Sequence, residues 1–457
     1  MFVIRTLMLV LLTGLPMAAL ASPCGEWFFQ LQQAFARAGI DDAQARTVPG
    51  YPHLGINRWL AFLKNEAHSD AQQQQWLRLS AAKAWQDQQL LLQRLPPARR
   101  PPADQPADTL LAQCLPALAA DTDFAALPAV TVPDSYSRWQ RVLGLYPLTA
   151  WLASGSIQAY HDDMSARFQA PVAAPTRLYS PAPASGPLPA PDSLADNPLR
   201  LPLPDAAQTR ALLQHYAPVL AVADSQRWNQ PGQIRMGHDS PQVAPPATAY
   251  YWLSWTRFRG QNLLQLNYEF WFSQRPKRGA LDLYGGKLDG LIWRVTLAGD
   301  GRVLFYDSIH PCGCYNKVYP VDPGLREADM DGDRPVFYPQ PVTDAATQRV
   351  MVQLQPDVHY VVRVAPLAEG LPVQRYGLRP ADSLRAIQRP DGTVTSLFND
   401  KGLVPASRRS ERFTLWPLGV PSAGTMRQPG SHATAFKGKR HFDDPRLPDT
   451  LFRPAAP

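Results

Sequence analysis

The chain has 457 residues, of which 45 are Lys or Arg and 38 are Asp or Glu, so its formal charge is +7. Hydrophobic residues make up 45%, and the 48 prolines are about twice the usual share. This composition excludes a wholly disordered chain, a collagen-like chain and a coiled coil.

The positive charge is spread along the chain. Nucleic-acid binding calls for a clustered basic surface on a recognisable fold motif, so we expect no nucleic-acid partner. The densest basic stretch, Lys437 to His441, is followed by Asp443 and Asp444. We interpret it as solvated surface, with an anionic membrane or polymer as the alternative partner.

Residues 1–21 have the pattern of a signal peptide. Arg5 precedes an apolar run from Leu7 to Leu12, and Ala19 and Ala21 flank a small-x-small cleavage site. The run is short for a spanning helix, and a retained membrane anchor is the alternative. No later stretch is long and apolar enough for a span, so we expect a periplasmic or secreted protein without a transmembrane segment in the mature chain.

Export places the four cysteines in an oxidising compartment, where they are expected to pair. Four cysteines allow three connectivities. Cys24 and Cys114 both lie in the helical N-terminal part, and we therefore predict a disulfide between them.

Residues 22–170 are predicted to form a helical domain. Apolar residues recur at helical spacing from Phe28, with Gly39 placed to end that helix, and from Leu77 to Leu95, with Ser69 or Asp70 as the N-cap. Two further helices are expected to contribute large apolar side chains to the core of a bundle: Trp139, Val142, Leu143, Trp151 and Tyr160.

Residues 171–204 contain ten prolines and are predicted to be a proline-rich connector between two domains. Such a composition favours extended, polyproline-like chain, which cannot build a packed core of its own. The alternative is an ordered strap that lies on the next domain.

Residues 205–457 are predicted to form a β-rich domain, entered through a helix from Asp205 to Tyr216. Strands are expected at residues 247–258, 262–272, 291–297, 303–309, 351–354, 358–364, 393–398 and 413–416. The fold class is therefore α+β, with an N-terminal helical domain followed by a larger antiparallel β-rich domain, either a sandwich or an open barrel.

Alternation along the expected strands gives a candidate catalytic site. If the strands at 262–272, 291–297 and 303–309 are neighbours, Glu269, Arg294 and His310 share one polar sheet face. Glu269 would act as a general base, Arg294 as a clamp for substrate or an oxyanion, and His310 as a base or metal ligand. The alternative is a wet sheet face with a Glu269–Arg294 cross-strand ion pair.

Two segments could bind a divalent metal such as zinc. His310 is followed by Cys312 and Cys314, which could bind zinc or copper, form a disulfide across Gly313, or form a redox-active pair. The segment 427–444 contains His432, His441 and Asp443, and we expect it to fold over the polar face near His310. The alternative for that segment is a surface loop with ordinary ion pairs.

The sequence carries no strong catalytic motif, which favours a non-catalytic binding or scaffolding protein of the cell envelope. Its partner would be an envelope glycan or protein that binds an aromatic-rich surface formed by Tyr250, Tyr251, Trp252 and Trp255. The alternative is a metal-dependent or hydrolase-like periplasmic enzyme with its site on the β-rich domain.

Overall fold

The structure is a computed structural model that describes residues 22–170, 176–184, 186–223, 226–330, 333–337, 349–366 and 372–453. The predicted signal peptide, residues 1–21, lies outside the described residues. The chain divides into two compact units, of which the first contains residues 1–41 and 45–132 and the second contains residues 42–44 and 133–457.

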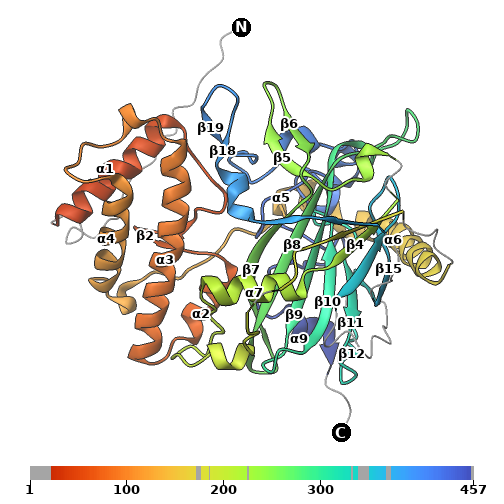
Figure 1. Ribbon diagram of the computed structural model, residues 1–457, viewed down its shortest axis with the longest axis horizontal. Coiled ribbons are helices and arrows are strands. Elements are labelled where there is room, and N and C mark those ends of the chain that lie inside the picture. Colours follow the sequence, from red (N-terminus) through yellow and green to blue (C-terminus); the bar gives the residue numbers. More distant parts are fainter. Residues whose placement is uncertain are drawn as a thin grey trace. The chain divides into compact units, whose positions relative to one another are not determined.

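The first unit is mainly helical, as predicted (Figure 1). Ser69 caps the longest helix in a capping box with Gln72, and Gly39 ends the first helix in the left-handed conformation. The elements of this unit are α1 (Pro23–Ala38), β1 (Thr47–Val48), β2 (Tyr51–Gly55), α2 (Arg58–Glu66), α3 (Asp70–Arg94), α4 (Ala107–Ala120) and two 3-10 turns, Pro97–Arg99 and Phe124–Ala126.

The predicted disulfide is confirmed, because Cys24 of α1 is bonded to Cys114 of α4. The helices α1, α3 and α4 pack around it through buried apolar side chains that include Phe28, Leu91 and Leu115. The bond links residues 90 positions apart, which restricts the unfolded chain and stabilises the unit by about 4 kcal/mol in the chain-entropy treatment.

The second unit is built on a seven-stranded sheet with the order β13-β11-β10-β9-β8-β7-β17 (Figure 1). The strands from β7 to β11 are antiparallel neighbours, whereas the edge strands β13 and β17 run parallel to theirs. The bounds are β7 (Thr248–Phe258), β8 (Gln261–Arg275), β9 (Gly286–Leu297), β10 (Val303–Ile309), β11 (Lys317–Pro320), β13 (Val336–Phe337) and β17 (Gly377–Pro380).

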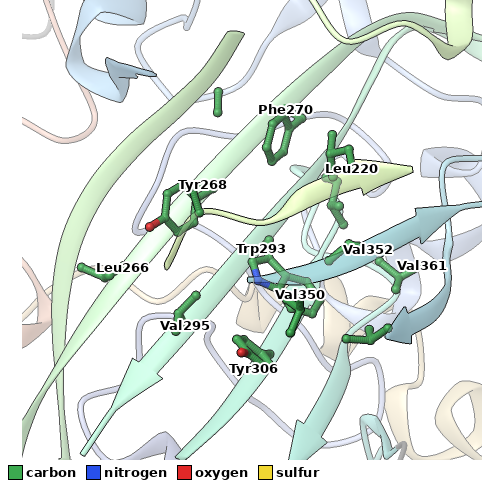
Figure 2. Packing of buried hydrophobic residues seen from close by; sticks show 14 of the residues in the cluster. Leu220, Leu266, Tyr268, Phe270, Trp293, Val295, Tyr306, Val350, Val352 and Val361 are labelled. Carbon is green, nitrogen blue, oxygen red and sulfur yellow. The ribbon is translucent and has the colours of Figure 1, made fainter. Parts of the chain in front are cut away.

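A five-stranded sheet with the order β15-β14-β4-β3-β16 packs against one face of the larger sheet. Figure 2 shows Leu220 of the smaller sheet near Phe270 of the larger one, and Val352 near Trp293. These residues are fully buried, so the two sheets form a sandwich with a continuous apolar core. The bounds are β3 (Arg177–Ser180), α7 (Ala206–Tyr216), β4 (Val219–Val222), β14 (Val350–Leu354), β15 (Val361–Pro366) and β16 (Val373–Arg375).

The other face of the larger sheet is covered by later, mostly irregular parts of the chain. Leu384, Phe398 and Met426 pack there against Tyr250 and Trp271 of the sheet. The remaining elements of the unit are α5 (Arg138–Leu143), α6 (Tyr146–Gln169), β5 (Gln233–Met236), β6 (Pro241–Ala244), β12 (Arg326–Glu327), β18 (Ile387–Gln388), β19 (Val394–Thr395), α8 (Arg412–Leu415), α9 (Leu447–Leu451) and β20 (Phe452–Arg453).

The fold class is confirmed as α+β, with helices followed by a β-rich region. The described strands form open sheets and no closed barrel, and the two larger sheets are mixed, because several of their strand pairs are parallel. The strand expected at 413–416 is wrong. Residues 412–415 form the short helix α8, and a 3-10 turn follows at Trp416–Leu418.

The proline-rich segment 171–204 is ordered in part. Its proline-free residues Arg177–Ser180 form β3, which pairs with both β4 and β16. The described part of the segment is therefore built into the smaller sheet, in agreement with the strap alternative. The predicted helical region 22–170 covers the first unit and also α5 and α6 of the second unit. Independent folding on either side of 171–204 stays a prediction.

The large apolar residues of α5 and α6 are not the core of a bundle, and that expectation is wrong. Trp139, Val142, Leu143 and Trp151 are each more than 60% exposed, whereas Tyr160 packs beside the core of the sandwich. None of the helices in the described ranges is long and apolar enough to cross a membrane.

Candidate functional site

Strand register separates the three predicted catalytic residues. Arg294 of β9 lies opposite Asn267 of β8 and Asp307 of β10, so Glu269 and Arg294 share a sheet face. Ser308 lies opposite Trp293 and belongs to the other face, on which His310 continues the alternation. The expectation that Glu269, Arg294 and His310 share one face is therefore wrong for His310.

A β-bulge is the physical reason for this difference. Val303 pairs with Leu297, but Phe305 pairs with Thr296, so one residue of β10 is extra. An extra residue moves every later side chain of a strand to the opposite face. Nothing in the alternation of apolar and polar residues showed where the bulge lies.

The face with Glu269 and Arg294 is not wet. Arg294 forms a bidentate ion pair with Asp307 and donates a hydrogen bond from Nη1 to the carbonyl oxygen of Phe442, 2.5 Å away. The ring of Phe442 covers the guanidinium, with 3.6 Å between Cζ and the ring centroid. The segment 427–444 thus folds over this face, but the predicted Glu269–Arg294 ion pair gives way to Arg294–Asp307.

Glu269 is fully buried on the same face, and neither of its carboxylate oxygens has a hydrogen-bond partner among the described residues. Burial raises its pKa to about 8, and the nearby indole of Trp271 opposes the shift. At neutral pH this carboxyl group is therefore mostly protonated and cannot accept a proton, so Glu269 does not suit a general base there.

The four predicted metal ligands have separate surroundings. Nε2 of His432 lies 3.1 Å from the carbonyl oxygen of Pro311, and burial lowers the pKa of His432 to about 3. Nε2 of His441 lies 3.1 Å from Asp134, and Asp443 borders Gly430. In the described ranges, no three His, Cys, Asp or Glu side chains are arranged to hold a metal ion.

His310 instead belongs to a buried polar cluster on the inner face of the large sheet, the side that packs against the smaller sheet. Asp289 of β9 lies between two histidines, with Oδ1 3.4 Å from Nδ1 of His310 and Oδ2 2.8 Å from Nδ1 of His359. His359 is itself fixed, because it stacks on Phe272 at 4.0 Å and its Nε2 lies 3.0 Å from the carbonyl oxygen of Trp228.

The charges in this cluster favour an ionised carboxylate beside a neutral imidazole. Burial alone would raise the pKa of Asp289, but His310 and His359 hold it well below its usual value. Burial lowers the pKa of His310, and it outweighs the opposing effect of Asp289. Nε2 of His310 is buried and has no hydrogen-bond partner among the described residues.

Two tyrosines pack near the ring of His310, and an arginine binds both of them. The ring centroids of Tyr315 and Tyr360 lie 4.8 Å and 5.6 Å from that of His310. Arg275, at the end of β8, donates hydrogen bonds to both phenolic oxygens, at 3.2 Å and 3.3 Å. Tyr315, Tyr360 and Arg275 are half-buried, so the cluster reaches the surface on this side.

Lys317 of β11 completes the cluster. Its Nζ lies 5.0 Å from the ring centroid of Tyr360 and 5.9 Å from that of Tyr160, and it makes no hydrogen bond or ion pair within the described residues. Burial lowers the pKa of Lys317 to about 7, so a substantial fraction of the side chain is a neutral amine near neutral pH.

The cysteines after His310 are free thiols, and Cys312 is buried. The hydrogen bond with Cys312 and burial raise the pKa of Cys314 well above its usual value, so this thiol stays protonated at neutral pH. Glu411 lies near Arg275, and burial raises its pKa to about 7. Cys312 and Cys314 therefore do not form the disulfide that was one of the alternatives.

Sequence reasoning identified only His310 of this cluster. It did not identify His359, Asp289, Lys317 or Arg275. The sequence signal that could have identified them is a charged residue inside an otherwise apolar strand. Asp289 stands in the run Leu288 to Leu297, and Lys317 opens a short strand of apolar residues. A buried strand retains such a charge only where a partner or a function compensates its desolvation.

Comparisons of the chain with known protein families, with curated proteins and with solved structures found no match. The geometry of the cluster therefore carries the functional argument alone.

Proposed function

We propose that the protein is an enzyme of the hydrolase type in which His310 is the general base and Asp289 is its positioning residue. The observation that carries this proposal is the buried imidazole of His310, which faces an ionised carboxylate through Nδ1 and has an unpartnered Nε2. An imidazole held in this way accepts a proton at Nε2 from a water molecule or a hydroxyl group. The 3.4 Å separation is long, as catalytic hydrogen bonds often are before substrate binds.

The neighbouring residues supply the other functions that hydrolysis needs. Arg275 and the phenolic groups of Tyr315 and Tyr360 provide hydrogen-bond donors for the negative charge that develops on a substrate oxygen. Lys317 adds a fourth donor at the inner wall of the cluster. These cationic and phenolic groups favour a substrate with an anionic or strongly polar group at the reacting end.

The proposal uses no metal, because the predicted ligands His310, His432, His441 and Asp443 do not converge. It follows the enzyme alternative and departs from the non-catalytic function that the sequence favours, for a structural reason. Tyr250 is buried, and the indole of Trp255 donates a hydrogen bond to the carbonyl oxygen of Pro202. The aromatic strand therefore does not offer an exposed platform, and an envelope glycan or protein as the partner stays a prediction.

We propose that the enzyme works outside the cytoplasm, in the periplasm or as a secreted protein. The pattern of residues 1–21 supports this location. The disulfide between Cys24 and Cys114 supports it independently, because such bonds persist in oxidising compartments.

The test is a panel of chromogenic carboxylic esters, phosphate esters, glycosides and anilides, assayed with the full chain at pH 7. We expect turnover of one of these classes, and a fall in kcat/KM of about 10²- to 10⁴-fold in His310→Gln, the range that general-base catalysis provides. The matched control is His238→Gln, which replaces an exposed histidine outside the cluster.

Two outcomes would overturn the proposal. One is a class of substrate that His310→Gln hydrolyses as fast as the parent chain. The other is no turnover of any class, in which case the non-catalytic binding function becomes the better account. Thermal denaturation of both variants separates a catalytic loss from a folding defect.

A further inference from the structure

The first half of the α5–α6 pair exposes a large apolar surface in the second unit. We call this set of residues the apolar face. Its members are between 53% and 69% exposed: Trp139, Val142, Leu143, Leu145, Leu148, Trp151 and Leu152. Scattered exposed apolar residues are normal, but a group this dense in one short stretch of chain, with two tryptophans, indicates an interaction surface.

The helices that carry the apolar face are fixed to the rest of the second unit by hydrogen bonds and packing contacts. Arg141 donates hydrogen bonds to the carbonyl oxygens of Leu418 at 3.0 Å and Gly438 at 2.7 Å, and its guanidinium stacks on Tyr136 and Tyr146. Further along α6, Met164 is buried in the core of the sandwich. The outward orientation of the apolar side chains is thus fixed by the fold.

The charges around the apolar face are predominantly positive. No acidic residue occurs between Asp134 and Asp162. Arg138 is exposed at the start of α5, and the loop that Arg141 holds carries the exposed Lys437 and Lys439. Two acids lie near this loop: Asp134 pairs with Lys439, and Asp333 accepts a hydrogen bond from the backbone N–H of Phe436.

We propose that the apolar face docks on the surface of an anionic phospholipid bilayer. Tryptophan and leucine side chains would enter the headgroup region, while Arg138 and Lys437 meet the lipid phosphates. The basic residues contribute electrostatic attraction to such a surface, and the buried apolar area contributes the rest. The helices would lie on the membrane without crossing it, in keeping with their limited apolar length.

The charge pattern favours lipid over a second copy of this chain as the occupant. A two-fold interface through the apolar face would bring the same excess of basic residues of both copies together. Like-charge contacts of this kind oppose association between proteins, whereas they strengthen binding to anionic lipid.

The test is co-sedimentation of the full chain with vesicles of phosphatidylglycerol and phosphatidylethanolamine, and with vesicles of phosphatidylcholine alone. The double variant Leu143→Ser/Trp151→Ser removes two exposed side chains of the apolar face. We expect it to lower the partition coefficient for the anionic vesicles at least tenfold. Lys437→Gln should weaken binding to anionic vesicles and leave binding to phosphatidylcholine unchanged.

The matched control is Leu281→Ser, which replaces a leucine that is 92% exposed outside the apolar face. It should bind as the parent chain does, and because all variants keep residues 1–21, the difference between them isolates the apolar face. Equal binding of the parent chain and the double variant would overturn the proposal. So would a dimer in sedimentation velocity that the double variant abolishes while vesicle binding persists.

Discussion

His310 and Asp289 meet on the inner face of the seven-stranded sheet, where Nδ1 of the histidine lies 3.4 Å from Oδ1 of the aspartate. The contact joins the end of β10 to the start of β9, so two neighbouring strands position the base. The second oxygen of Asp289 is held at 2.8 Å from Nδ1 of His359, which fixes the carboxylate from the opposite side. The dyad therefore rests on rigid strands, as a preorganised catalytic pair requires.

Replacement of Asp289 by asparagine should destabilise the protein. The change removes a buried charge that both histidines face, and we expect a loss of about 2–4 kcal/mol in the free energy of unfolding at pH 7. Because the pKa of Asp289 is lowered on folding, the stability that it provides is present at neutral pH and lost as the pH falls below about 4. Urea denaturation at pH 7 and pH 4 measures both effects.

The control for this prediction is Asp300→Asn, in the exposed turn between β9 and β10, where the aspartate pairs with Arg302. An exposed pair of this kind contributes less than about 1 kcal/mol. Equal losses in the two variants would show that the charge of Asp289 has no special role in stability.

Replacement of Lys317 by methionine should stabilise the protein. The unfolded chain keeps this lysine protonated up to a pH of about 10.5, whereas the folded protein does so only up to about 7. The cost of burying the amine therefore grows as the pH falls from about 10 to 7 and is constant below that. We expect Lys317→Met to gain about 2–4 kcal/mol at pH 6 and little at pH 10, as measured by urea denaturation.

The exposed Lys287 of β9 provides the matched change Lys287→Met, which should have little effect at either pH. A loss of stability in Lys317→Met at pH 6 would mean that the ammonium has a stabilising partner. A stabilised variant with reduced activity would show that the cost of burial is retained for function.

Glu269→Gln should also stabilise the protein, with the opposite dependence on pH. The carboxyl group of the unfolded chain ionises above pH 4.5, whereas burial keeps that of the folded protein neutral up to about pH 8. The free-energy cost of burying Glu269 therefore increases as the pH rises from about 4.5 to 8, and this cost is about 3 kcal/mol at pH 7. Thermal denaturation should show a larger gain in Tm at pH 8 than at pH 5.

Glu327→Gln, at a half-exposed position of β12, is the control and should give a small change at both values of pH. A gain in Glu269→Gln that does not vary between pH 5 and pH 8 contradicts the assignment of a neutral, buried carboxyl group.

The C-terminal segment covers one face of the large sheet, so Phe442→Ala should lower the free energy of unfolding strongly. Its ring packs on Arg294, Ile292 and Ile309, so truncation opens a cavity beside a buried ion pair. We expect a loss of about 3–5 kcal/mol in urea denaturation. Phe413→Ala, which truncates a phenylalanine that is 67% exposed, should cost less than about 1 kcal/mol, and equal losses would argue against the cover.

Local patterns in the sequence predicted the features that depend on neighbouring residues. Gly39 indicated the end of α1, and Ser69 indicated the start of α3. The pairing of Cys24 with Cys114 followed from the helical character of one region and was correct. Each of these signals lies within a few residues of the feature it predicts, or within the same helical region.

The candidate site depends on features that local patterns do not encode. The bulge between Val303 and Phe305 decides which face His310 joins, and it leaves no trace in the alternation of residues. The contact between Asp289 and His359 spans 70 positions and is set by tertiary packing. Similarly, helical periodicity found the apolar stripes of α5 and α6 but could not show that they face outward.

The most direct test of the proposed base is ¹⁵N NMR of the full chain labelled at histidine, with the His310 signals assigned by their loss in His310→Gln. At pH 7 we predict a neutral imidazole with a proton on Nδ1 and no proton on Nε2. In Asp289→Asn the fraction of this tautomer should change, because the carboxylate that accepts from Nδ1 is lost. The imidazole of His310 should titrate at a lower pH than histidine ordinarily does, because burial lowers its pKa. A doubly protonated ring at pH 7, or a proton on Nε2, would contradict the account.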